Sequence, residues 1–255
     1  MLLATWNVNS IRARLPRVLP WLEERQPDVV CLQETKCIDD EFPRDEIEAL
    51  GYHVEIYGQR TYNGVAILSR EPVTNVVRGL PDDEPDADRR VIAATAGDID
   101  VYGFYVVNGQ SVGTEKFDYK LAWLERVRQF VESRYEEGRK IVLCGDFNVA
   151  PDDRDVWDPA HWHERILCST PERQALQRLL DVGFQDAFRA FHEEGGYYSW
   201  WDYRTLGFPK NRGLRIDHIF VSPAALEACQ DVVIDRDARK GKKPSDHAPV
   251  MATFA

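Results

Sequence analysis

The chain has 255 residues, of which 44% are hydrophobic and 29% charged, and its formal net charge at pH 7 is −11. This length suits one large α/β domain or two small ones, and the composition is typical of a folded globular protein. No apolar run approaches the roughly 20 residues that cross a bilayer, so we expect no membrane segment. The acidic total alone disfavours a polyanionic substrate, because nucleic-acid binding usually leaves a basic surface. Basic residues are concentrated at positions 203–216 and 236–243, however, so a locally basic face remains possible.

The N-terminus and the cysteines indicate a cellular compartment. The first residues, MLLATWNVNS, lack the charged lead and long apolar stretch of a secretion signal, and we expect a first strand there. The five cysteines are an odd number without a CxxC pair, which disfavours a disulfide framework and a zinc site. We therefore expect reduced thiols in a cytoplasmic protein.

Strand and helix patterns follow one another along the chain. The β-branched, apolar segments LLATWN, DVVCLQE, GVAILS, RVIAATA, IDVYGFYVV, KIVLCGDF, RIDHIFVS and APVMATF are each about as long as a strand. One helix is predicted after Ser10, which is a candidate N-cap, and another from about residue 115 to 137. A third is predicted from Thr170, where a capping residue precedes a proline.

The spacing of these elements predicts the fold class. The strand segments between residues 64 and 107 leave no room for helices, so much of the sheet should be antiparallel. We find no linker and no repeat, and we expect one domain over residues 1–255. The prediction is an α/β (α+β) fold of four layers, in which two mixed, mostly antiparallel sheets form a sandwich flanked by helices.

Acids and amides gather at the ends of the predicted strands. Each of them alone has an ordinary explanation as a turn former, a helix cap or a structural histidine. Together they could converge on one rim of a sheet, where hard oxygen ligands suit Mg²⁺ or Mn²⁺. They are Asn7, Asn9, Glu34, Asp146, Asn148, Asp217, Asp246 and His247.

Five segments carry a family resemblance. In order and at compatible spacings, TWNVNSIRAR, LQETK, GDFNVAP, GLRIDHIFVS and PSDHAPV resemble the exonuclease III branch of the endonuclease/exonuclease/phosphatase superfamily. NGVAILS, SWWDYR and GLRIDHI narrow the resemblance to bacterial abasic-site endonucleases. The resemblance implies a Mg²⁺-dependent DNA repair hydrolase that cuts 5′ to abasic sites. It also implies 3′→5′ exonuclease and 3′-phosphatase or phosphodiesterase activity on double-stranded DNA, by a cytoplasmic, nucleoid-associated monomer, with Mn²⁺ as an alternative metal.

The same resemblance implies roles for individual residues. Glu34 would bind the metal, Asp146 would activate or orient water, and Asn148 would donate a hydrogen bond to the phosphoryl oxygen. His247 would contact the phosphate or the water, oriented by Asp246 or Asp217. The implied metal-facing set is Asn7, Glu34, Asp146, Asn148, Asp246 and His247, and the implied catalytic set is Tyr105, Asp146, Asn148, Asp217 and His247. One departure is Val107, where the family pattern usually has proline.

Residues 197–215 combine aromatic and basic side chains, which suits stacking on an extruded sugar while phosphates are held. The resemblance implies that Trp200, Leu214 and Ile216 form the wall of an abasic-site pocket. The alternative is that Trp200 and the adjacent Trp201 belong to the core. Further basic residues lie between positions 236 and 243. The implied DNA contacts are Asn9, Lys36, Arg90, Asn108, Trp200, Arg212, Leu214 and Ile216. Among these, Asn108 resembles the family's phosphate-contacting asparagine.

Two other functions remain open on this reading. A phosphoesterase of the same superfamily with a non-DNA substrate would predict a membrane-facing hairpin, extra domains or disulfides. A catalytically silent nucleic-acid-binding module would predict loss of the metal or base residues, yet the strand-end set is present in full. The balance among the activities and the choice between one and two metal ions also stay open.

Overall fold

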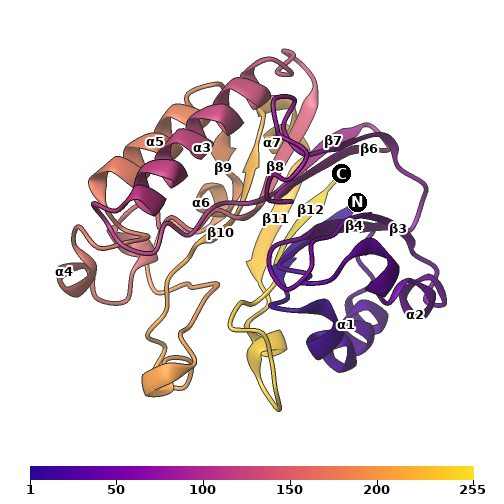
Figure 1. Cartoon of the computed structure of the whole chain (residues 1–255), viewed down its shortest axis with the longest axis horizontal. Helices are drawn as coiled ribbons and strands as arrows, with labels where there is room; N and C mark the ends of the chain where they lie inside the picture. Colours follow the sequence, from indigo (N-terminus) through magenta and orange to yellow (C-terminus); the bar gives the residue numbers. More distant parts are fainter.

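Two six-stranded sheets pack face to face in the computed structural model, which describes residues 1–255 apart from the side chain of Thr205. Helices α1 (Ile11–Arg25) and α2 (Arg44–Glu48) cover the outer face of the first sheet (Figure 1). Helices α3 (Glu115–Glu132) and α5 (Thr170–Leu180) cover the outer face of the second sheet. These four layers confirm the predicted α/β sandwich.

The first sheet has the order β11-β12-β1-β2-β4-β3. Its strands are β1 (Leu2–Asn7), β2 (Val29–Gln33), β3 (His53–Tyr57), β4 (Val65–Ser69), β11 (Cys229–Ile234) and β12 (Val250–Phe254). The second sheet has the order β5-β6-β7-β8-β10-β9. Its strands are β5 (Thr74–Arg78), β6 (Val91–Ala96), β7 (Ile99–Tyr105), β8 (Lys140–Asp146), β9 (Gln185–Asp186) and β10 (Asp217–Val221).

Parallel pairing occurs where a long helix separates two strands. Strand β1 pairs in parallel with β2 after α1, and β7 pairs in parallel with β8 after α3. The other paired strands of the described chain run antiparallel. A parallel pair needs a crossover connection whereas an antiparallel pair can be joined by a short turn, so the segment lengths account for this mixture.

All eight predicted strand segments are strands, and the three predicted helices are present. Ser10 caps α1 as predicted, whereas α3 ends at Glu132 rather than near residue 137, and the N-cap of α5 is Ser169, one residue before the predicted start. The remaining helices are α4 (Pro159–Trp162), α6 (Ala187–Phe191) and α7 (Pro223–Ala228). Short 3₁₀ turns lie at Asp39–Glu41, Asp153–Asp155, Arg204–Leu206 and Arg236–Arg239.

The sheets are buried on both faces, which explains their continuous apolar segments. Along β1, Leu3 belongs to the core between the two sheets, whereas its neighbour Ala4 belongs to the core beneath α1. In β8, Cys144 faces the other sheet and Leu143 faces α3 and α5. Such strands read as apolar runs rather than as an alternation of apolar and polar residues. The packed sheets hold the strand ends at fixed positions.

None of the described helices has the length and apolarity to cross a membrane. The five cysteines are free thiols, and four of them are buried.

Candidate active site

One rim of the sandwich collects the predicted strand-end residues. Strand β1 ends at Asn7, β2 ends one residue before Glu34, and β8 ends at Asp146. Strand pairing sets Asp146 between Tyr105 of β7 and Asp217 of β10. Parallel strands bring their carboxyl ends to the same edge, and the antiparallel β10 begins where they end.

The backbone turns sharply just after these strands. Asn9, Glu34, Lys36 and Asn148 have φ values of 45°, 52°, 55° and 51°, in the left-handed region. Asparagine tolerates this conformation, whereas Glu34 and Lys36 adopt it at a cost in backbone strain. Hydrogen bonds such as Ser10 N to Glu34 O (2.7 Å) hold these turns in place. Strain of this kind is concentrated at functional sites.

His247 is held by Asp217, not by its neighbour Asp246. The imidazole Nδ1 lies 2.8 Å from Asp217 Oδ2, and the ring's Nε2 lies 3.7 Å from Asp146 Oδ2. The hydroxyl of Ser199 donates to Asp217 Oδ2 (2.6 Å) and accepts the backbone N–H of Asp217 (3.0 Å). The imidazole therefore lies between two carboxylates, and one of these is fixed in turn by a serine that the sequence analysis did not single out.

Asn7 joins the Asp146 carboxylate to another carboxylate of the rim, that of Glu34. Its Nδ2 donates to Glu34 Oε2 (3.0 Å) and to Asp146 Oδ2 (2.9 Å). The ammonium of Lys36 lies 3.2 Å from Glu34 Oε1. Asn7 presents its amide nitrogen to both carboxylates. It could act as a metal ligand only if the side-chain amide flipped, so that its oxygen faced the metal.

Asp246 links the rim to the aromatic loop. Its carboxylate accepts hydrogen bonds from Asn9 Nδ2 (2.9 Å) and Trp200 Nε1 (3.0 Å). Asn9 Oδ1 in turn accepts a hydrogen bond from Lys36 Nζ (2.7 Å). Asp246 therefore positions Trp200 and Asn9, two of the predicted DNA contacts.

Asn148 lies directly beside Asp146. Its backbone N–H donates to Asp146 Oδ1 (2.9 Å), and its side-chain Nδ2 donates to Val106 O (2.9 Å). Its Oδ1 accepts a hydrogen bond from Asn108 Nδ2 (3.1 Å). The two asparagines that the resemblance assigns to phosphate binding are thus in contact with each other.

Burial and nearby charges shift the pKa values of Asp146 and His247. Burial raises the pKa of Asp146 to about 7, and the neighbouring anion Asp217 acts in the same direction. Burial alone would lower the pKa of His247, but the carboxylates of Asp217 and Asp146 outweigh it and raise that pKa to about 10. At neutral pH the imidazole is therefore a cation, and Asp146 is close to its titration midpoint, as suits a general base.

Tyr105 is partly buried at the edge of this cluster. Burial, together with the negative charges of Glu34 and Asp146, raises the pKa of its phenol well above 10. The guanidinium of Arg90 lies 4.8 Å from the centre of the ring, and its Nη1 donates to Tyr105 O. Tyr105 therefore keeps its proton and can donate it in a hydrogen bond to a phosphoryl oxygen.

These residues fit a divalent cation. Asp146, Asp217 and His247 are buried and offer ligand atoms within 4.8 Å of one another. The Glu34 carboxylate, bridged to Asp146 by Asn7, adds further oxygen donors on the other side. Carboxylate oxygens are preferred ligands of Mg²⁺ and Mn²⁺. The site is thus a buried metal-binding centre rich in oxygen.

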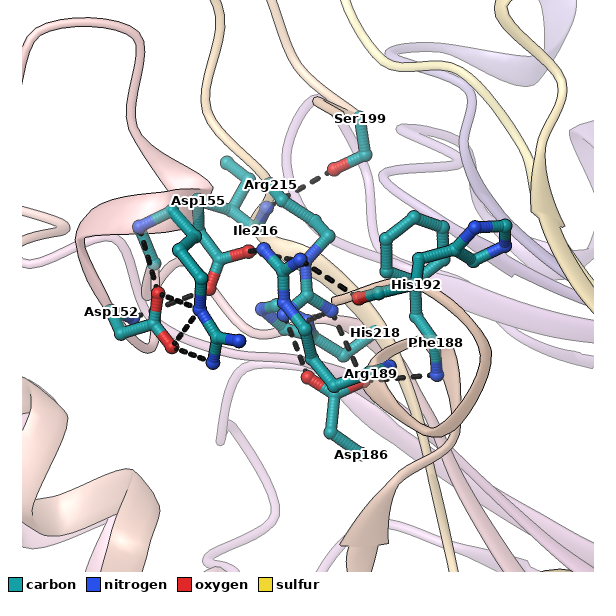
Figure 2. A network of polar contacts seen from close by, with 12 residues as sticks. Asp152, Asp155, Asp186, Phe188, Arg189, His192, Ser199, Arg215, Ile216 and His218 are labelled. Carbon is teal, nitrogen blue, oxygen red and sulfur yellow. Dashed lines mark hydrogen bonds and ion pairs between the residues drawn. The ribbon is translucent and has the colours of Figure 1, made fainter. Parts of the chain in front are cut away.

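A buried ionic network surrounds Arg215, which precedes β10 by two residues (Figure 2). Arg215, 1% exposed, donates through Nε to Asp155 Oδ1 (2.6 Å) and through Nη2 to Asp186 Oδ2 (2.7 Å). Its Nη1 lies 3.0 Å from His218 Nδ1. Burial and the positive charge of Arg215 lower the pKa of His218 to about 4. Arg215, one of the basic residues of the aromatic loop, therefore holds β10 and its flanking loops rather than facing solvent.

The predicted wall of the abasic-site pocket is closely packed. Leu214 and Ile216 are 0% and 1% exposed, and they share a small core with Leu167. Trp200 is half-buried against that core, whereas Trp201 is fully buried, as the core alternative expected for it. Trp200 and Leu214 also line a hollow of about 360 Å³, together with Arg212, which stacks 4.9 Å above the ring of Trp157.

Known proteins resemble this chain along its whole length. Residues 4–247 match the sequence profile of the Endonuclease/Exonuclease/phosphatase family. Exodeoxyribonuclease III of Haemophilus influenzae is 40% identical over 262 residues, which cover 98% of each protein. The DNA repair nuclease APEX1 of Danio rerio is 32% identical, over 100% of this chain and 82% of that protein.

Solved structures share the fold closely. The structure of the 3′ phosphatase NExo (D146N) from Neisseria bound to product DNA hairpin has a TM-score of 0.97 and 47% identity, covering 100% of this chain and 99% of that one. The AP endonuclease from Archaeoglobus fulgidus has a TM-score of 0.95 and 40% identity, with the same coverage.

Proposed function

Because this chain belongs to the exonuclease III/AP endonuclease branch of the endonuclease/exonuclease/phosphatase superfamily, we propose that it is a Mg²⁺-dependent enzyme that hydrolyses phosphate esters in double-stranded DNA. At the level of the family, the chain is a hydrolase and a DNA repair nuclease of the exonuclease III type. Mn²⁺ is the proposed alternative metal. We further propose that the enzyme is a monomeric bacterial protein of the cytoplasm that associates with the nucleoid while it acts.

The observation that carries the proposal is the position of Asp146, between His247 on one side and Asn7 with Glu34 on the other. Asp146 takes the proton of the attacking water. The cationic His247 stabilises the negative charge that builds on the phosphoryl group. Asn148 and Tyr105 donate hydrogen bonds to the phosphoryl oxygens.

Glu34 and Asp146 would hold the metal. Asp217 and a neutral His247 beside Asp146 are the alternative ligand pair, and in that arrangement His247 would not act as the cation. When bound, a divalent cation supplies charge neutralisation on the phosphate and on the leaving oxygen. Asn7 holds the carboxylates of Glu34 and Asp146 close together. Asp246 orients Asn9 and Trp200 at the margin of the site.

We rank removal of 3′ phosphates and 3′→5′ exonuclease action first, and incision 5′ to abasic sites second. The Neisseria relatives are described as a 3′ phosphatase and a 3′-5′ exonuclease, at 47% and 48% identity. The Archaeoglobus fulgidus relative, an AP endonuclease, keeps abasic incision as the second candidate.

The test is a panel of three duplexes in the presence of Mg²⁺: a nick with a 3′ phosphate, a blunt end and an internal abasic site. We expect 3′-phosphate removal to be the fastest reaction, abasic incision to be slower, and EDTA to abolish all three. Phosphoinositide vesicles serve as the substrate for the non-DNA alternative. Cleavage of the vesicles with all three duplexes intact would overturn the proposal. Duplex binding without cleavage would instead identify a silent binding module.

A further inference from the structure

Lys120 is a lysine in the core of the protein. It lies on α3, and its side chain is 0% exposed. Its Nζ makes an ion pair with Glu172, at the start of α5, whose side chain is also 0% exposed. A buried charge of this kind requires a full set of hydrogen-bond partners, because its desolvation is costly.

The other partners of Lys120 are the carbonyls of the two phosphate-site asparagines. Nζ donates to Asn148 O (2.7 Å) and to Asn108 O (3.2 Å). All three donors of the ammonium are therefore used, one on a carboxylate and two on backbone oxygens at the rim of the site. The side chains of the same two asparagines are joined by the bond from Asn108 Nδ2 to Asn148 Oδ1 (3.1 Å).

Glu172 is equally well satisfied. Its Oε1 also accepts the backbone N–H of Leu167 (3.0 Å), and its Oε2 accepts the N–H (3.1 Å) and hydroxyl (2.5 Å) of Ser169. The carboxylate therefore anchors Lys120 to the N-terminus of α5, a rigid element. The side chain of Lys120 is in this way fixed by all three of its interactions.

Gly109 leaves the space that Lys120 occupies. It follows Asn108 with a φ of 84°, and a Cβ at this position would lie 3.0 Å from Lys120 Cδ and 3.2 Å from Ile166 Cδ1. The turn after Asn108 thus depends both on a left-handed backbone and on the missing side chain. The loop that has Val107 in place of the family's usual proline is held here by Lys120.

We propose that Lys120, anchored by Glu172, is a positioning residue that holds Asn108 and Asn148 in the arrangement needed to grip the scissile phosphate. This inference rests on the proposed function, in which these asparagines contact the phosphate. Its physical basis is that one ammonium fixes two carbonyls from separate loops, after β7 and after β8, at a common point. A purely apolar pair at these positions could fill the same volume but could not orient either carbonyl.

The experiment compares two variants with a matched control. Lys120→Met removes the ammonium but leaves Glu172 buried without a cation, so it lowers stability as well. Lys120→Met combined with Glu172→Gln removes both charges and avoids the unpaired carboxylate. Ser169→Ala removes one hydrogen bond to Glu172 without altering the bonds from Lys120 to the asparagines. Unfolding in urea and steady-state removal of a 3′ phosphate from a nicked duplex are measured for each protein.

We expect the double variant to fold and to lose about 10- to 100-fold in kcat, with KM changed by less than about threefold, because the asparagines act mainly in the transition state. Ser169→Ala should lose stability and keep its kcat. In a background with both Asn108→Ala and Asn148→Ala, the charge removal should have little further effect on kcat, since Lys120 acts through those two residues.

A double variant with the kcat of the unmodified protein would overturn the inference, as would an equal loss of kcat in the background that lacks both asparagine side chains. A double variant whose activity falls only in proportion to its folded fraction would also overturn it and assign the pair a purely structural role. Failure of the proposed function looks different, because the unmodified protein would then leave the 3′ phosphate in place.

Discussion

The imidazole of His247 and the carboxylate of Asp217 share a hydrogen bond of 2.8 Å, and the opposite ring nitrogen faces Asp146 at 3.7 Å. His247 follows directly on Asp246, but Asp246 is hydrogen-bonded to Asn9 and Trp200 instead. The carboxylate that determines the protonation of the imidazole thus comes from β10 of the second sheet. His247 precedes β12 of the first sheet, so this hydrogen bond connects the two sheets within the site.

Replacement of Asp217 by Asn should change the pH dependence of the reaction. The Asp217 carboxylate raises the pKa of His247, so its removal lowers that pKa, and the imidazolium is lost at a lower pH. We expect the basic limb of the kcat profile to move to lower pH by at least about one unit, with kcat at pH 7.5 reduced about 100-fold or more. Asp246→Asn is the control, because that carboxylate makes no hydrogen bond to the ring, and its profile should move less. Equal displacements in the two variants would contradict the assignment.

Asp146→Asn and His247→Ala should each lower kcat by several orders of magnitude while the protein stays folded. The first removes the proton acceptor and the second removes the cation beside the phosphate. Single-turnover removal of a 3′ phosphate measures the effect, and circular dichroism checks the fold. Asp98→Asn, which changes an exposed carboxylate paired with Lys140, should leave the rate unchanged. Retention of most of the activity in Asp146→Asn would contradict the role of Asp146.

Metal removal should be reversible and should depend on Glu34. We expect EDTA to abolish activity and added Mg²⁺ or Mn²⁺ to restore it. Glu34→Gln should raise the Mg²⁺ concentration for half-maximal activity about 10- to 100-fold, because it removes a charged oxygen donor. Titration of metal-free protein with Mg²⁺ at a fixed DNA concentration gives this value. An unchanged Mg²⁺ requirement in Glu34→Gln would exclude Glu34 as a ligand.

Acid should destabilise the protein through His218. Its pKa is about 4 in the folded protein and 6.5 as a free group, so unfolding takes up a proton between these values. The stability contributed by the neutral imidazole is complete above pH 6.5 and is lost as the pH falls toward 4. The difference of about 2.5 units corresponds to about 3 kcal/mol at 1.36 kcal/mol per unit.

Urea unfolding at pH 7.5 and pH 4.5 measures this term. His218→Gln, which can still accept from Arg215 and donate to Val149, should show a smaller loss between the two pH values than the unmodified protein. His53→Gln changes an exposed histidine and should follow the unmodified protein. If His218→Gln lost as much free energy of unfolding as the unmodified protein, His218 would not be the responsible group.

The strands that sequence analysis did not predict share one position in the fold. β3, β5, β9 and β11 are the four edge strands, whereas the eight predicted strands are those paired on both sides. A central strand here is covered on both faces and reads as an apolar run, but an edge strand such as Thr74–Arg78 is largely exposed. Its residues therefore resemble those of a loop. The composition of a strand reports its burial more directly than its hydrogen bonding.

The site could be predicted as a set of residues but not as a network. Motif spacing brought Asp146, Asp217 and His247 together, because each lies at the end of an apolar segment. It could not choose between Asp217 and Asp246 as the partner of His247, since that choice depends on the pairing of β8 with β10. Nor could it show that Arg215 is buried, because a lone arginine in a basic segment reads as exposed.

Lys120 had a signal that the sequence analysis did not use. Counting back from Leu124 and Val127 along α3, the residue at helical spacing on the buried face is Lys120 rather than Leu121. A lysine at a core position predicts a buried partner. The partner, Glu172, lies at the start of α5, and only the tertiary packing brings the two together.

The hydrogen bond from Trp6 Nε1 to His247 O (3.2 Å) spans 241 residues of chain. Strand β1 is among the first segments to leave the ribosome, yet its partner β12 and the imidazole beside Asp146 are made more than 200 residues later. A nascent chain that stops short of β12 has neither His247 in place nor a closed first sheet. Segments from both ends of the described chain are therefore needed together to complete the rim that carries Asp146.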